Sequence, residues 1–257
     1  MEGWGGSDIP GMTPGILRRR LLLPACLVLL AGAGLLSAAP AAAQQGGACP
    51  QYGPTQLKVE VLTAPLRRDY GRSINQLANM PGRAPGPAGA SNGHILGLAL
   101  VKHGERSNLE ALVQPMGDGT FCVTPKLLTA GFGYEERTIY VARELPQNSC
   151  IFGEVLNHEM KHIAVDEQLL REYAPTLNRR LEAVAARMKP VRARSRDQAM
   201  RALLQPVNGL LRQTLQEFGQ ERERRQSQVD TLAEYERVSR SCNGEINRYI
   251  PKGKRRV

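Results

Sequence analysis

The most informative stretch of this chain is Asn157-His158-Glu159-Met160-Lys161-His162-Ile163, because it places two histidines four residues apart. On an α-helix, residues four apart lie nearly above one another, so both imidazoles can reach one tetrahedral metal ion. Glu159 is rotated from His158 by about 100°, and its carboxylate can take a proton from a water molecule there. The spacing predicts a zinc site with His158 and His162 as ligands and Glu159 as general base.

The flanking residues predict that this motif lies inside a helix. Asn148 and Ser149 are good N-cap residues. On a helical wheel the two histidines and Glu159 share the apolar arc, and burial of such polar groups is costly unless they are paired or bound to metal. A structural His cluster without metal is the alternative. The apolar residues that recur at helical spacing are Ile151, Phe152, Val155, Leu156, Ile163, Leu169 and Leu170.

The motif and its apolar flanks resemble the zincin metallopeptidases, although Lys161 is charged where that family prefers an uncharged residue. The order of elements between Thr120 and Cys242 also resembles an uncharacterised family of predicted bacterial secreted zinc-dependent proteases. That family tends to carry a Tyr-Asp pair and a His-Gly near its end. This chain has Tyr235-Glu236 and Asn243-Gly244 instead.

A catalytic zinc ion needs a third protein ligand. The metzincin pattern is absent, and a gluzincin-like Glu on the next helix makes Glu182, twenty residues after His162, the candidate ligand. Asp166, one turn beyond His162, is expected to orient a ring nitrogen. Glu234 and Tyr235 are the alternative source of a ligand and of a phenol that stabilises the transition state. His94 and His103 are lesser candidates.

The first 43 residues have the features of a cleavable signal peptide. Arg18-Arg19-Arg20 precedes an apolar run from Leu21 to Ala39, and cleavage is expected near Ala43. A retained transmembrane anchor is the rival interpretation. The mature chain keeps four cysteines, which predicts two disulfides in the periplasm or outside the cell, with three pairings open. These cysteines are Cys49, Cys122, Cys150 and Cys242.

The remaining sequence predicts an α+β fold, with a small zincin-like sheet followed by the active-site helix and a C-terminal helical region. The expected order is a catalytic domain over 44–188, a basic helical extension over 189–250 and a basic tail over 251–257. Within the catalytic domain we expect strands between 55 and 145, among them 56–63, 94–102 and a hairpin that turns at Gly131 and Gly133. The motif helix is expected over about 150–173, with Pro175 separating it from a second helix over about 176–188. By analogy with the zincins, 138–142 is a candidate edge strand for peptide substrate.

Charge is unevenly distributed along the chain. The net charge is +10, and residues 179–257 carry 19 Lys and Arg against 9 Asp and Glu, whereas residues 44–178 carry 12 against 13. The basic part suggests an anionic cell-envelope polymer or membrane surface as partner. An exported chain with 5% aromatic residues argues against nucleic acid. The sequence thus predicts an exported zinc metallopeptidase that cleaves proteins or peptides. The alternative is a non-catalytic envelope protein with a structural or vestigial metal site.

Overall fold

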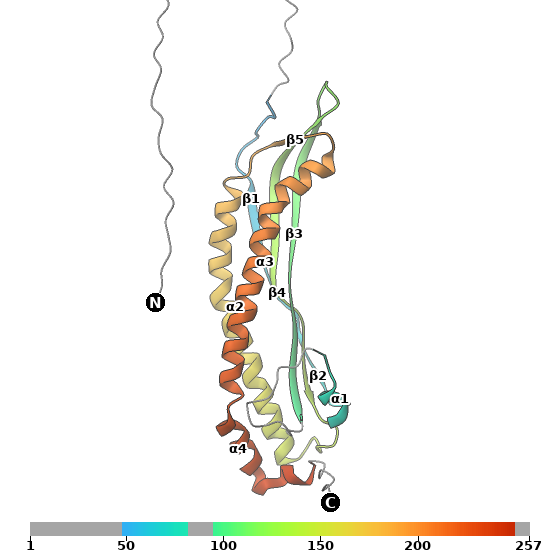
Figure 1. The fold of residues 1–257 in the computed structure, drawn as a ribbon, viewed down its shortest axis with the longest axis vertical. Coiled ribbons are helices and arrows are strands. Elements are labelled where there is room, and N and C mark those ends of the chain that lie inside the picture. The colour runs from blue at the N-terminus through green and yellow to red at the C-terminus, as the bar shows by residue number, and fades with distance from the viewer. Residues whose placement is uncertain (1–47, 82–94, 250–257) are drawn as a thin grey trace, which may run out of the picture. The chain divides into compact units, whose positions relative to one another are not determined.

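A computed structural model describes residues 48–81 and 95–249. The predicted signal peptide, His94 and the basic tail lie outside these residues. One mixed sheet and two long helices form the described part, and the helices α2 and α3 run side by side along the sheet (Figure 1). The fold is α+β, with most strands before the helices, as the sequence predicts. A short helix, α1 (Ile74–Ala78), follows β2.

The central strand of the sheet is β4 (Phe121–Val141). β3 (Gly97–Pro115) pairs antiparallel with β4 along its whole length. On the opposite edge of β4, β1 (Gln56–Thr63) and β2 (Leu66–Asp69) pair in parallel, and β5 (Val191–Ala193) pairs antiparallel. The strand predicted over 56–63 is β1, whereas the strand predicted over 94–102 is only the beginning of β3.

The hairpin predicted at Gly131 and Gly133 is wrong, because β4 runs through both glycines without a turn. Gly133 has a φ of +142°, and a Cβ at this position would collide with the backbone carbonyl of Leu62 in β1. Glycine therefore permits a close approach of two strands here. The substrate-binding edge predicted over 138–142 is also wrong. Thr138 pairs with Arg67 of β2 on one side and with Leu100 of β3 on the other.

The motif helix α2 (Cys150–Ala185) begins at Ser149, whose side chain accepts a hydrogen bond from the backbone N–H of Phe152. It does not end before Pro175, so the separate second helix predicted over 176–188 is wrong. A proline inside a helix removes one hydrogen bond and costs about 3 kcal/mol. Leu177 and Leu181, which follow Pro175, are buried in the same core as Leu169 and Leu170, and this burial offsets the cost.

Helix α3 (Arg196–Val229) is likewise continuous, although it contains Pro206 in its interior. Its buried stripe, which includes Leu203, Val207 and Leu211, continues across the proline. Asp230 ends the helix, and Thr231 caps α4 (Leu232–Arg240) by accepting from the backbone N–H of Glu234. A 3₁₀ segment, η1 (Ser241–Arg248), completes the described chain.

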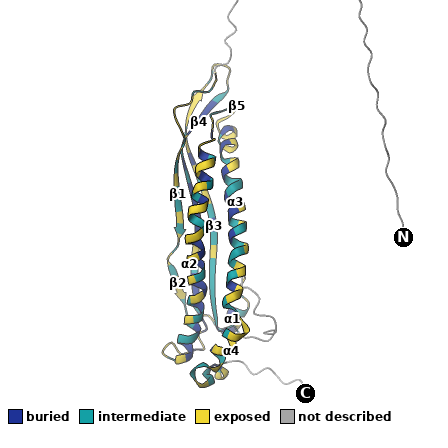
Figure 2. Ribbon diagram, turned by 90° about the vertical axis from the view of Figure 1, so that its left-hand side faces the viewer, coloured by how far each residue is buried: buried dark blue, intermediate teal, exposed yellow. Residues whose placement is uncertain are grey.

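Both long helices pack on one face of the sheet and bury the sides that face the strands (Figure 2). The larger core joins β4, α2 and α3, so residues on both sides of the expected domain boundary at 188 share one core. A second core joins the end of β4, the first turns of α2 and the C-terminal elements α4 and η1. This second core places the C-terminal elements beside the His motif.

Two disulfides confirm the prediction from the cysteine count. Cys49 bonds to Cys122 at the start of β4, and Cys150 at the start of α2 bonds to Cys242 in η1. The second bond closes a segment of 92 residues and ties the end of the described chain to the motif helix. Among the described helices, none is both long enough and apolar enough to cross a membrane.

Candidate metal centre

Three donor atoms from two distant segments meet at the first turns of α2. His158 Nε2 and His162 Nε2 lie 3.3 Å apart, and each lies 3.2 Å from Asp230 Oδ1. The side chains of both histidines are 11% exposed and that of Asp230 is 20% exposed. The two histidines thus share this corner as their spacing predicts, and Asp230, at the end of α3, completes the triangle.

His162 is oriented by a chain of buried polar groups from α3. Its Nδ1 faces the Oε1 of Gln226, and the amide nitrogen of Gln226 donates to Asp166 Oδ1 at 2.7 Å and to the His162 carbonyl at 3.1 Å. Because these two bonds require the amide nitrogen to point inward, Oε1 must accept from His162 Nδ1–H. The Nε2 atom of His162 then keeps its lone pair for a metal ion.

Asp166 is fully buried and fixes the position of the Gln226 side chain. Arg222 donates to both of its carboxylate oxygens, at 2.7 and 3.1 Å. The predicted role of Asp166, orientation of a ring nitrogen, is therefore exerted through Gln226 and not by direct contact. Carboxylates that orient a metal-binding histidine commonly change metal affinity when they are mutated.

His158 is oriented from α4. Its Nδ1 lies 3.4 Å from Glu234 Oε1, and Glu234 also accepts from Lys161 at 2.6 Å and from Arg237 at 3.0 Å. The hydrogen bond from Arg237, reinforced by Lys161 and His158, lowers the pKa of Glu234 well below its usual range despite the effect of burial. Lys161, which departs from the zincin pattern, thus supports a residue that contacts His158. Glu234 orients a histidine and is not in the donor triangle.

The two histidines determine the electrostatics of Asp230. Burial alone would raise its pKa, but hydrogen bonds from His158 and His162 outweigh burial and hold the pKa well below its usual range. For His162 burial acts in the other direction and lowers the pKa. The hydrogen bond to Asp230 and the charges of Glu159 and Asp230 outweigh burial, so the pKa of His162 lies above its usual value. Metal binding needs the neutral imidazole of His162, so this raised pKa makes metal binding compete with protons.

Glu159 is only 5% exposed and lies against the beginning of β3. Its carboxylate accepts a hydrogen bond from the backbone of Ala99, and a Cβ on Gly97 would lie 2.5 Å from its Oε1. Glycine at position 97 is therefore required for this packing. Burial raises the pKa of Glu159 to about 7, although the neighbouring histidines act in the opposite direction. A carboxyl group with this pKa can both take up and give back a proton near neutral pH.

The donor triangle fits zinc. Zn–N bonds of about 2.0–2.1 Å in a tetrahedral arrangement separate two ligand atoms by about 3.3 Å, and the three separations here are 3.2, 3.2 and 3.3 Å. Two nitrogens and one carboxylate oxygen are a common catalytic zinc set. The remaining ring nitrogen of each histidine contacts a carboxylate or an amide, as is usual for zinc ligands. Asp230, His158 and His162 form the one group of this kind found among the described residues.

No protein-family model, curated protein or solved structure matches this chain. What the site does must therefore be argued from its own residues.

Glu182, the predicted third ligand, does not join the site. It lies on the same continuous helix as His162, twenty residues further on, which corresponds to about 30 Å along the axis. Its side chain is exposed and accepts a hydrogen bond from Asn178. The error follows from Pro175, because a helix that broke there could have folded Glu182 back towards the motif.

Tyr235 lies beside the site, as the sequence suggests. Its ring packs edge-on against His158 with 5.9 Å between centroids, and its hydroxyl lies 3.5 Å from Asp230 Oδ1. Burial and the charge of Asp230 raise its pKa, so the phenol keeps its proton. His103 lies elsewhere, on β3 beside Phe218.

Sequence reasoning missed Asp230, Gln226 and Arg222. One local signal was available for Asp230. Thr231 and Glu234 stand three apart, a pattern typical of a helix start, which places Asp230 in a break between helices, where a side chain is free to bind a ligand. Gln226 and Arg222 lie inside the charged stretch of α3 and carry no local signal that separates them from their neighbours.

Proposed function

We propose that this chain is an exported zinc-dependent metallopeptidase with His158, His162 and Asp230 as its metal ligands. The observation that carries the proposal is the donor triangle, whose sides match the spacing of tetrahedral zinc ligands, with Glu159 packed beside it. The two disulfides support export to an oxidising compartment. The choice of a peptide bond as the target rests on the resemblance of the motif to zincins.

The proposed chemistry divides the work among these residues. A bound zinc ion would supply Lewis-acid chemistry, by polarising the substrate carbonyl and acidifying a water molecule. Glu159 would be the general base and then the general acid: its carboxylate would accept a proton from water and return it to the leaving amine, for which a pKa of about 7 is well suited. Tyr235 keeps its phenolic proton, which it directs at Asp230 Oδ1 from 3.5 Å, and it would redirect this hydrogen bond to the developing oxyanion.

The low exposure of the site favours a second candidate, a metal-binding protein without catalysis. Glu159 is 5% exposed, and the segment from Asp230 to Tyr235 covers both histidines. A structural zinc site is closed in this way, whereas a catalytic site keeps a position open for water and substrate.

One set of measurements separates the two functions. The exported protein, purified with its disulfides intact, is expected to contain one zinc ion per chain and to hydrolyse a fluorescent casein. Glu159→Gln should lose that hydrolysis by at least about 100-fold while keeping its zinc. Glu182→Gln, a matched change on an exposed part of the same helix, should alter neither.

Activity that survives Glu159→Gln would refute the proposed mechanism. Zinc without hydrolysis in the unaltered protein would favour the structural site. Absence of zinc at neutral pH after metal reconstitution would refute both.

A further inference from the structure

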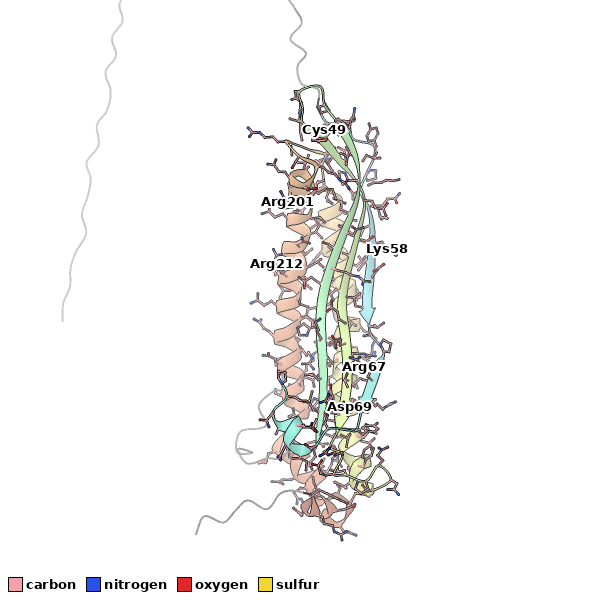
Figure 3. The ribbon with its side chains drawn as sticks, turned by 90° about the vertical axis from the view of Figure 1, so that its right-hand side faces the viewer. Cys49, Lys58, Arg67, Asp69, Arg201 and Arg212 are labelled. Carbon is pink, nitrogen blue, oxygen red and sulfur yellow. A yellow bond between two sulfur atoms is a disulfide. The ribbon has the colours of Figure 1, made fainter. Side chains whose placement is uncertain are left out.

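A basic surface lies at the opposite end of α2 and α3 from the metal centre, where β5 connects the two helices. Residues 183–216 contain seven Lys and Arg and a single acidic residue, Asp197. Six of these cations are exposed, and five of the six lie in or near β5 and the adjoining helix ends. These five are Arg187, Lys189, Arg194, Arg196 and Arg201, which we call the basic end. Figure 3 shows Arg201 on α3 at the same end as Cys49, with Arg67 and Asp69 towards the other end.

Among the described residues, the cations of the basic end lack acidic partners. Lys189, Arg194, Arg196 and Arg201 have no carboxylate within ion-pair distance in the part of the chain that the structure describes, and the guanidinium of Arg187 donates to the carbonyl of Ala183. The second half of α3 is different, because Arg222, Arg224 and Arg225 all pair with Asp or Glu. Gathered like charges repel one another and destabilise the fold, and an anionic partner would remove that cost.

An apolar pocket opens between the same residues. Arg187 and Lys189 stand at its wall, and the rest of the lining comes from the end of α2, from β5 and from the second and third turns of α3. The apolar side chains involved are Val184, Met188, Pro190, Val191, Leu203 and Pro206. An anionic polysaccharide would use the cations but not the pocket. A lipid would use both, since it carries a phosphate and a hydrocarbon chain.

We propose that the basic end docks on a membrane surface rich in anionic phospholipid. The unpaired cations bind headgroup phosphates, and the pocket accepts the apolar part of a lipid. This inference does not depend on the proposed peptidase activity. Docking would fix the distance of the metal centre from the membrane. His158 precedes Ala185 by 27 residues on one continuous helix, so docking would hold the metal centre about 40 Å along the helix axis from the lipid contact.

The test is sedimentation of the disulfide-bonded protein with vesicles of phosphatidylcholine alone or mixed with phosphatidylglycerol. The protein is expected to bind only the mixed vesicles, and salt should weaken the binding. Each basic residue near an anionic surface contributes about fivefold in affinity, so Lys189→Gln with Arg194→Gln should bind about thirtyfold more weakly. Arg68→Gln with Arg143→Gln removes two exposed cations outside the basic end and should bind within about twofold of the unaltered protein.

Neither double variant should unfold at a lower temperature than the unaltered protein, because none of the four side chains has an ion pair among the described residues. Lys189→Gln with Arg194→Gln should unfold at the same or a slightly higher temperature, because it relieves repulsion between cations. Equal weakening by the two pairs would overturn the proposal, since net charge alone would then explain the binding. Equal binding to phosphatidylcholine vesicles would overturn it as well. Binding to soluble dextran sulfate without binding to the mixed vesicles would assign the surface to an anionic polymer instead.

Discussion

Gly97→Ala should displace Glu159 without removing bound metal. Gly97 begins β3 at the point where this strand meets α2. An added Cβ would lie 2.5 Å from Glu159 Oε1, 2.8 Å from Glu159 Cγ and 2.7 Å from Val155 Cγ1. Ordinary contacts of a Cβ begin at 3.4 Å, so Glu159 must move by nearly 1 Å or the strand must withdraw. Both displaced side chains are buried, and neither can swing into solvent at low cost.

Overpacking of this kind typically costs 1–3 kcal/mol, so Gly97→Ala should unfold at a lower temperature or lower denaturant concentration than the unaltered protein. The zinc content should stay the same, since the substitution touches no ligand. A general base displaced by about 1 Å should slow hydrolysis about 100-fold. Gly153→Ala is the matched control on α2, because a Cβ there would meet no atom within 4 Å. It should be neutral or stabilise the helix by up to about 1 kcal/mol. If Gly97→Ala unfolds with the same midpoint as the unaltered protein, the packing of Glu159 against β3 is refuted.

Three further predictions concern the metal centre. Asp230→Ala should remove zinc binding measured by competition with a chromophoric chelator, whereas Glu182→Ala should leave it unchanged; the reverse pattern would restore Glu182 as the ligand. Asp166→Asn should weaken zinc binding about 10- to 100-fold, because the buried bonds that orient His162 through Gln226 are altered, and unchanged affinity would contradict this role. In the metal-free protein, burial raises the folded-state pKa of Glu159 from 4.5 to about 7, so the folded state binds the extra proton and stability falls as the pH rises through 7. Glu159→Gln should remove a loss on the order of 3 kcal/mol between pH 5 and pH 8, measured by urea denaturation, and an unaltered pH dependence would contradict a buried Glu159.

The sequence predicted those parts of the site that depend on local spacing. Ser149 caps α2, and the apolar stripe and the two histidines repeat with the helical period, so their common face follows from the geometry of one element. The pairing partners of β4 do not follow in this way. Gly131 and Gly133 are typical of a turn. In the strand, a Cβ on Gly133 would collide with Leu62 of β1, and a Cβ on Gly131 would meet the side chain of Arg106 of β3, so their role follows only from the paired strands.

The two interior prolines show why the third ligand was mislocated. Local propensity ends a helix at proline, but tertiary packing can outweigh it when the residues beyond are buried. Pro175 is followed by Leu177 and Leu181 in the main core, and Pro206 is followed by Val207 and Leu211. Both helices therefore continue. Continuity carries Glu182 away from the motif, and it brings Asp230, 68 residues after His162 in the sequence, to the His pair.

The metal centre depends on contacts that hold the C-terminal elements on α2. Exposed ion pairs such as that of Arg237 with Glu154 contribute little, because solvent screens them. The durable attachments are Val238 and Ile246 in the second core and the disulfide between Cys150 and Cys242. A crosslink that closes a segment of this length removes on the order of 4–5 kcal/mol of unfolded-state entropy in the chain-entropy account. The histidines come preformed on one helix, and Gln226 and Arg222 hold the end of α3, which carries Asp230, against Asp166 of that helix. Glu234 and Tyr235 on α4 reach the histidines through the attachment of the C-terminal elements. Oxidation of this cysteine pair therefore stabilises the position of the two residues that flank His158, and it ties the arrangement of the site to the oxidising compartment that the cysteines already indicate.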